Sequence, residues 1–222
     1  SYHITEENVY GSIQFKIPFV FQSYINPHQS IDVTKAARLA KEMESLSTSL
    51  PLSPSASIFV CYDEARPDVM KALITGPSNT PYANGCFEFD IFFPPNYPSV
   101  PMMVNLITTG QGMVRFNPNL YNNGTVCLSI LNTWSGSPAE MWNSLTSNLL
   151  QVLVSIQSLV LVEQPYFNEP GYEQTLGSLH GTTESFVYNA NIYVSTLQWA
   201  ILNQLKNPSP CFKDVCAISF SI

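Results

Sequence analysis

At 222 residues and 24.7 kDa, the chain is long enough to bury one sizeable core. Hydrophobic residues make up 45% of it and charged residues only 11%, which is typical of a folded protein rather than a disordered one. Nine Lys and Arg against sixteen Asp and Glu give a formal charge of −7. This charge argues against a nucleic-acid partner, because phosphate binding needs clustered cations, and favours a basic protein partner.

The cysteine pattern predicts a reducing, cytoplasmic location and no metal site. Five cysteines occur, an odd number, and none forms a Cys-x-x-Cys pair, so neither a disulfide framework nor a zinc site is expected. The first seven residues lack the basic start of a signal peptide. The longest apolar run, residues 149–162, is too short and too polar to predict a membrane span.

Residues 1–30 are rich in aromatic and β-branched side chains and are expected to form an extended N-terminal flank. A helix should then begin near Val33 or Thr34, one of which we expect to cap it, because apolar residues follow at helical spacing. This helix should end before Pro51, where a Ser/Pro-rich linker begins.

Four apolar segments predict an antiparallel meander of strands: residues 57–62, 69–75, 86–93 and 102–108. In the third segment every second residue from Phe87 to Phe93 is apolar and most of the others are polar, so a half-buried strand is expected. Residues 76–85 have the turn chemistry of a hairpin loop. The four prolines of residues 94–101 exclude a central strand there.

The second half of the chain predicts helices. Residues 146–162 are apolar on nearly every face, and their length favours a buried helix. A last helix is expected from Tyr188 to Leu205, ending at Asn207-Pro208. A helix, a meander, a long irregular loop and further helices make an α+β fold. We expect residues 31–172 to form the core domain and residues 173–222 a C-terminal helical extension.

Cys127 stands out in the long irregular loop, because a lone thiol among turn formers fits a nucleophile. The alternative is that Cys127 is a buried small hydrophobe. A cysteine hydrolase would need a histidine to activate the thiol. The three histidines of the chain lie in expected flanks and loops, at positions 3, 28 and 180, which disfavours that class of enzyme.

Several motifs in the right order resemble the ubiquitin-conjugating (UBC) enzymes. They are Ile74-Thr75-Gly76-Pro77, Thr80-Pro81-Tyr82 with Gly85, Phe93-Pro94-x-x-Tyr97-Pro98-x-x-Pro101, and Asn117-Pro118-Asn119 eight residues before Cys127-Leu128-x-Ile130-Leu131. The resemblance covers residues 33–172. Further motifs, up to Pro208-Ser209-Pro210-Cys211-Phe212, resemble the branch whose UBC domain lies at the C-terminus of giant BIR-repeat proteins, and this likeness covers most of the chain.

The resemblance implies a UBC fold: an N-terminal helix, a four-stranded antiparallel meander, an active-site loop and C-terminal helices. It implies that an ATP-dependent activating enzyme passes ubiquitin to Cys127 as a thioester, and that a lysine of a protein substrate then accepts it. No cofactor is expected on the chain, since ATP is used by the activating enzyme. The branch implies a hybrid with ligase activity that inhibits apoptosis. An inactive variant that only binds ubiquitin or serves as a scaffold is the alternative, and a ubiquitin-like modifier also stays open.

The resemblance assigns roles to other loop residues. Asn119 matches an asparagine that either donates to the oxyanion of the tetrahedral intermediate or braces the loop. Asn117 stands where the family motif has histidine, and together with Pro118 is expected to brace the loop. Many members have an acid where this chain has Ser129. The task of helping the lysine lose its proton then falls to Glu169, whose alternative is a solvated loop carboxylate.

The loop after the cysteine, residues 132–141, is longer than the minimal fold requires. Together with Ser129, Trp134 within it is a candidate active-site loop residue. Such a loop either covers the thioester or is a tolerated insertion. Trp134 itself is expected to pack rather than to serve as a ligand platform.

Overall fold

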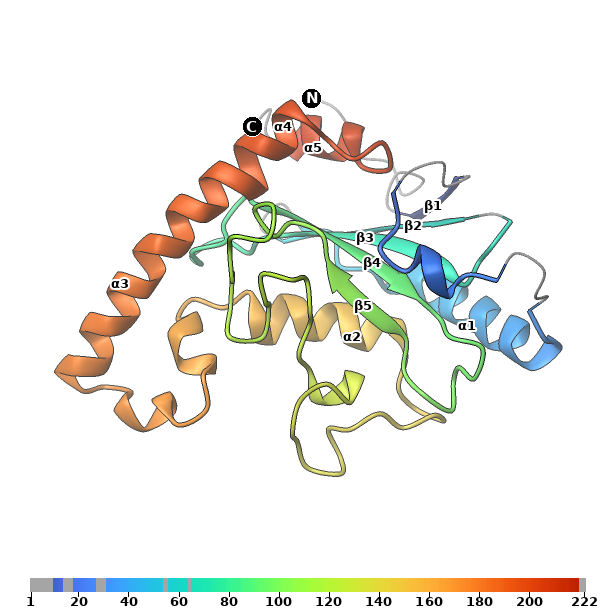
Figure 1. The fold of residues 1–222 in the computed structure, drawn as a ribbon, viewed down its shortest axis with the longest axis horizontal. Coiled ribbons are helices and arrows are strands. Elements are labelled where there is room, and N and C mark those ends of the chain that lie inside the picture. Colours follow the sequence, from blue (N-terminus) through green and yellow to red (C-terminus); the bar gives the residue numbers. More distant parts are fainter. Residues whose placement is uncertain (1–9, 14–17, 27–30, 54–55, 64, 220–222) are drawn as a thin grey trace.

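The computed structural model describes residues 10–13, 18–26, 31–53, 56–63 and 65–219. A five-stranded sheet lies at the centre, in the order β1-β2-β3-β4-β5 (Figure 1). The strands are β1 (Tyr10–Ile13), β2 (Ile58–Asp63), β3 (Val69–Thr75), β4 (Cys86–Phe92) and β5 (Met103–Leu106). The predicted antiparallel meander is confirmed in β2 to β5, where Val60 lies opposite Ala72 and Ala72 opposite Phe89.

The fifth strand, β1, was not predicted. It pairs in parallel with β2, with Tyr10 opposite Val60 and Ile13 opposite Asp63. A run of four residues is too short to show the alternation of apolar and polar side chains that predicts a strand. Strand β1 forms because the edge of β2 offers backbone groups that can pair with it. The remaining parts of the expected flank, residues 1–9, 14–17 and 27–30, lie outside the described residues.

Helix α1 (Val33–Ser49) begins where expected, but the predicted cap was wrong. Asp32 caps the helix, because its carboxylate accepts a hydrogen bond of 3.0 Å from the backbone N–H of Lys35. Val33 has no side-chain acceptor to offer. Leu39 and Leu46 of α1 are fully buried in the main core, against what we call the inner face of the sheet.

The predicted buried helix at residues 146–162 is confirmed as α2 (Leu149–Ser155), continued by a π-helical turn at Ile156–Val160. Asn148 and Gln151 start α2 with a reciprocal capping box. In Figure 1, α2 lies below the sheet. Its buried face packs on the same core as α1 through the apolar side chains Leu149, Val152, Leu153, Ile156 and Val160.

The prediction that the third strand is half-buried was wrong, because every residue of β4 is buried. On the outer face of the sheet, opposite α2, Lys71 of β3 forms ion pairs with Glu88, at 3.1 Å, and with Asp90. Both ends of this face are covered by segments remote in sequence. They are a C-terminal cluster with Phe212, Val215 and Cys216, and an N-terminal one with Phe19 and Phe21.

The last long helix starts earlier than predicted. Helix α3 (Leu179–Ser195) begins nine residues before Tyr188, since Ser178 caps it by accepting a 3.0 Å hydrogen bond from the N–H of Gly181. The run continues through the π-helical turn Thr196–Leu202 and α4 (Asn203–Lys206), so the expected end before Asn207 is confirmed. The first two turns of α3 contain polar residues and a glycine, so the apolar spacing that predicts a helix is absent there.

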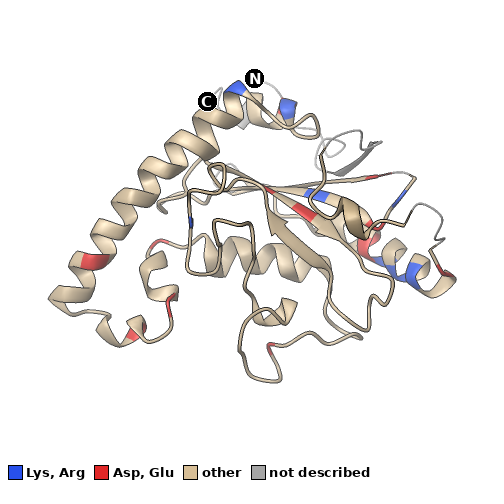
Figure 2. Cartoon of the chain, viewed as in Figure 1, with Lys and Arg blue, Asp and Glu red and all other residues tan. Residues whose placement is uncertain are grey.

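The expected apolar face of this helix is only partly buried. Ile192 and Ala200 are buried, whereas Leu197 and Leu205 are about half exposed. Figure 2 shows that α3 is almost free of charge, and Glu184 is its one Asp, Glu, Lys or Arg. The last helix of the described residues is α5 (Lys213–Ser219), which lies on the outer face of the sheet (Figure 1). None of the helices in the described ranges has the length and hydropathy to cross a bilayer.

Candidate active site

Cys127 lies in the segment that we call the cysteine loop, residues 116–128, which follows β5 and leads into the single 3₁₀ turn Ser129–Leu131. Only 7% of Cys127 is exposed, so the thiol is more buried than the turn-rich sequence predicts. Isolated bridges, not strands, join Asn117 to Leu120 and Leu120 to Val126. The position of Cys127 therefore depends on individual hydrogen bonds rather than on a strand ladder.

Asn117 is fully buried and uses both ends of its amide. Its Nδ2 donates to the carbonyl of Val160 at 2.8 Å and to the hydroxyl of Tyr82 at 3.1 Å. Its Oδ1 accepts from the backbone N–H of Asn119 at 2.8 Å. These contacts tie the cysteine loop to the π-helical turn that continues α2.

Asn119 holds both backbone groups of Cys127. Its Nδ2 donates to the carbonyl of Cys127 at 2.8 Å, and its carbonyl accepts from the N–H of Cys127 at 2.9 Å. Of the two roles left open for Asn119, this geometry fits bracing, because the amide is already engaged by the backbone rather than turned to the thiol.

Two bracing residues have no counterpart in the sequence analysis. The Nδ2 of Asn168 donates to the side-chain oxygens of Asn117 and Asn119, each at 3.4 Å, and to the carbonyl of Leu159 at 3.0 Å. The hydroxyl of Thr133 donates to the carbonyl of Val126 at 2.7 Å and accepts from the N–H of Leu128 at 2.9 Å. An asparagine beside Glu169 was the available signal for the first, and nothing in the sequence marked the second.

Arg115 is the charged residue that sequence reasoning missed. It contacts Glu169 at 3.2 Å, donates to the carbonyl of the buried Pro118 at 2.8 Å, and stacks on the ring of Tyr121 at 4.3 Å. Glu169 is thus ion-paired rather than merely solvated. A signal existed, since Arg115 is the one Lys or Arg between Lys71 and Lys206 in the sequence.

Burial and charge act in opposite directions on the thiol. Burial raises the pKa of Cys127 above its ordinary value, and the positive charge of Arg115 offsets part of this rise. Less thiolate is therefore present at neutral pH than on a free cysteine, and Arg115 is the cation that counteracts this.

After Ser129–Leu131 comes the segment that we call the following loop, residues 132–148. A groove of about 650 Å³ runs between this loop and α2, and its lining includes Asn119, Ser129, Trp134 and Glu140. Ser129 lies at the base of the loop, where its hydroxyl donates to the carbonyl of Ser135 at 3.3 Å. Glu140 is the one charged residue in the lining.

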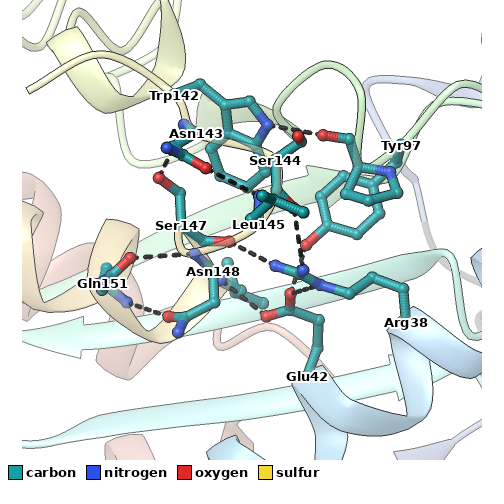
Figure 3. A network of polar contacts seen from close by, with 12 residues as sticks. Arg38, Glu42, Tyr97, Trp142, Asn143, Ser144, Leu145, Ser147, Asn148 and Gln151 are labelled. Atoms are coloured by element: carbon teal, nitrogen blue, oxygen red, sulfur yellow. Dashed lines mark hydrogen bonds and ion pairs between the residues drawn. The ribbon is translucent and has the colours of Figure 1, made fainter. Parts of the chain in front are cut away.

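The far end of the following loop is anchored to α1 (Figure 3). Arg38 pairs with Glu42 at 2.8 Å and donates to the carbonyls of Ser144, at 3.2 Å, and Ser147. Glu42 also accepts from the hydroxyl of Tyr97 and, at 2.8 Å, from the first N–H of α2. Trp142 donates to the carbonyl of Pro98 at 2.8 Å. Glu42 therefore joins α1 to α2 directly and to the following loop through Arg38.

The arrangement contains a thiol, amides that are hydrogen-bonded around it, and an ion pair. Within the described ranges, no three His, Cys, Asp or Glu side chains are placed to hold a metal ion. His180 is exposed at the start of α3, and the other two histidines lie outside the described residues. Cys127, the amide braces and the Arg115–Glu169 pair form the candidate active site.

Comparisons with known proteins agree with the fold and the motifs. The sequence model of the ubiquitin-conjugating enzymes matches residues 38–194. The chain is 57% identical over 216 residues to the human and mouse proteins named "Dual E2 ubiquitin-conjugating enzyme/E3 ubiquitin-protein ligase BIRC6", which covers 97% of this chain and 4% of theirs. It is 54% identical over 202 residues to "Probable ubiquitin-conjugating enzyme protein 17" of Caenorhabditis elegans, covering 90% of this chain and 28% of that protein.

The chain thus spans a small part of the length of these relatives. The identity to BIRC6 confirms the resemblance seen in the sequence, and the family match covers α1 from Arg38, strands β2 to β5, the cysteine loop, α2 and most of α3. The chain belongs to the family of ubiquitin-conjugating enzymes.

Proposed function

We propose that the chain is an active conjugating enzyme that carries ubiquitin as a thioester on Cys127 and transfers it to a substrate lysine. The observation that carries the proposal is the placement of Cys127. Asn119 fixes both of its backbone groups, and Asn117 and Asn168 fix Asn119 in turn. Such a chain of hydrogen bonds holds a reacting atom in position, whereas a cysteine that only fills the core needs none.

In the first step the Cys127 thiolate attacks the carbonyl carbon at the ubiquitin C-terminus, which the activating enzyme presents as a thioester. The bond from that carbon to the activating enzyme's sulfur breaks, and this sulfur leaves as a thiolate. Arg115 favours the step by stabilising the Cys127 thiolate. ATP is consumed by the activating enzyme and needs no site on this chain.

In the second step a lysine amine attacks the same carbonyl carbon, and the bond to the Cys127 sulfur breaks. The lysine arrives as an ammonium and gives one proton to Glu169 before it attacks. After the attack the nitrogen loses a second proton, which the departing Cys127 thiolate takes up, so that the isopeptide nitrogen keeps one hydrogen. Glu169 and Arg115 are partly exposed, so their ion pair is weak enough for an incoming lysine ammonium to replace Arg115. Because Ser129 has no carboxylate, the acids that we consider for this proton are Glu169, which pairs with Arg115, and Glu140, which lines the groove.

By analogy with BIRC6, whose printed name joins conjugating enzyme and ligase, we propose that this chain is the conjugating module of such a hybrid. Its partners would be ubiquitin, an activating enzyme and lysine-bearing protein substrates. A cytoplasmic location and a part in inhibiting apoptosis stay predictions.

Loading with activating enzyme, ATP and ubiquitin tests the proposal. The wild-type chain should form an adduct that reductant removes, and Cys127→Ser should form one that reductant leaves intact, because an oxyester replaces the thioester. Cys61 is a half-buried cysteine on the outer face of the sheet, and Cys61→Ser is the matched control. This variant should load ubiquitin like wild type under reducing conditions.

The same assay separates the alternatives. Ubiquitin and ubiquitin-like modifiers are each tested with two activating enzymes. If only a ubiquitin-like modifier forms the thioester, that modifier takes the place of ubiquitin in the proposal. No adduct with any combination, while the chain still binds ubiquitin, would favour the inactive binding module.

A further inference from the structure

Four of the five cysteines form two pairs on the outer face of the sheet. Cys61 of β2 meets Cys211, and Cys86 of β4 meets Cys216 of α5; in each pair the side chains are within hydrogen-bond contact. Both pairs belong to the cluster in which Phe212 and the α5 side chains pack on Phe59 and Leu73. Each pair therefore joins the sheet to the C-terminal segment, residues 211–219.

The two pairs differ in access. Cys86 and Cys216 are 0% and 1% exposed, so a dissolved oxidant reaches them only if α5 leaves the sheet. Cys61 and Cys211 are half-buried, and the thiol of Cys61 also lies 3.6 Å from the carbonyl of Cys211. The Cys61–Cys211 pair is the one that a small molecule can reach in the folded chain.

The surroundings also favour Cys61 as the attacking thiol. The hydrogen bond from Cys211 lowers the pKa of Cys61, against the opposing effects of burial and of the Glu88 carboxylate. The same pairing and burial raise the pKa of Cys211, and Lys71 opposes this rise. A thiol with a lowered pKa, next to a second thiol, is the usual arrangement of a redox-sensitive pair.

We propose that Cys61 and Cys211 are a thiol-oxidation site that closes to a disulfide with low-molecular-weight disulfides such as glutathione disulfide, and so latches the C-terminal segment to the sheet. The Cys61 thiolate attacks one sulfur of the oxidant, whose S–S bond breaks and releases one glutathione thiolate. The Cys211 thiol, losing its proton, then attacks the Cys61 sulfur of the mixed disulfide and releases the second glutathione. Two protein thiols are oxidised, and one disulfide is reduced to two thiols.

The latch acts on the segment that covers the outer face. The two residues are 150 apart in sequence, so the cross-link closes a long loop and removes much of the freedom of the unfolded chain. A melting temperature higher by about 10 °C is the expected scale of the effect for a chain of this size. Lys213, exposed in α5, should also become a poorer trypsin site, because α5 can no longer lift from the sheet.

The test treats the full chain with glutathione and glutathione disulfide at a series of fixed ratios. The Cys127→Ser background is used, so that the catalytic thiol adds no adduct of its own. Intact mass should show loss of two hydrogens, and peptide mapping without reduction should join Cys61 to Cys211. The melting temperature and the rate of trypsin cleavage at Lys213 should change with the same ratio.

Cys61→Ser and Cys211→Ser serve as matched variants, and each should abolish the cross-link and both changes. A lasting glutathione adduct on Cys61 without the second exchange would overturn the proposal, as would a disulfide mapped to Cys86 and Cys216. No cross-link between Cys61 and Cys211 in the wild-type chain, where an adduct on Cys127 maps to its own peptide, would overturn it as well, and this arm needs no variant to fold.

Discussion

The cysteine loop (residues 116–128) and the following loop (residues 132–148) adjoin in sequence but are held in different ways. Neutral amides fix the first along its length, through Asn117, Asn119 and Asn168. The second is tied at its start by Thr133 and at its far end by Arg38 and Glu42, while most of its middle is exposed.

This difference shows how precision and adaptability are divided at the site. Buried amides have fixed partners, and each lost partner leaves a polar group unsatisfied, so the cysteine loop has one conformation. The middle of the following loop has few such contacts and lines a groove of about 650 Å³, so it can change with an occupant of the groove at little cost. Substitutions in each region test this division.

Glu42→Ala should weaken the anchor of the following loop and destabilise the chain by about 3–5 kcal/mol, because it leaves the Nε of Arg38, the hydroxyl of Tyr97 and the first N–H of α2 without their acceptor. Urea denaturation measures the change. The exposed Glu44 on the same helix is the matched control, and Glu44→Ala should cost less than about 0.5 kcal/mol. Equal losses for the two variants would show that the anchor contributes nothing specific.

If Asn119 also donates to the oxyanion, Asn119→Ala should slow discharge to free lysine by about 100-fold, the scale of a lost transition-state donor, while loading persists. Single-turnover discharge of the purified thioester measures it. A discharge rate equal to wild type would leave Asn119 without a catalytic role. Parallel losses in loading and discharge would instead assign it to bracing alone, the role that its bond to the Cys127 carbonyl fits.

Arg115→Gln should lower the rate of Cys127 alkylation by iodoacetamide about twofold to fivefold at neutral pH, the effect of one partly exposed charge. Removing the cation raises the thiol pKa further, so less thiolate is present and the pH–rate curve moves to higher pH. Glu169→Gln should act in the opposite direction, since it leaves the charge of Arg115 uncompensated. Lys41 is an exposed cation on α1, and Lys41→Gln is the control. It should leave the pH–rate curve of Cys127 alkylation unchanged, and a shift of that curve would indicate a general effect of net charge.

Discharge measured across pH in Glu169→Gln tests the proposed role of Glu169 in transfer. If Glu169 takes the proton of the incoming lysine, discharge to free lysine should need a higher pH in Glu169→Gln, although its thiol reacts faster with iodoacetamide. An unchanged discharge profile would leave Glu169 as the ion-pair partner of Arg115 only.

Sequence alone determined the elements whose signal is local. The motifs around Asn119 and Cys127, the proline loop from Phe93 to Pro101, the apolar period of α1 and the apolar segments of α2 and β2 to β5 were enough to predict the fold and the candidate nucleophile. Each of these depends on residues close in the chain, where turn chemistry and periodicity carry the information.

Folding fixed the contacts between segments that are remote in sequence. It covered the outer face of β4, brought Arg115 to Glu169 over 54 residues, placed Glu42 at the start of α2 over 107, and set Cys61 against Cys211 over 150. None of these pairs has a local pattern, because the contact forms only after the sheet and its flanking segments have packed. Cys127 could thus be identified from its neighbours in sequence, but its burial and the charge that acts on it could not.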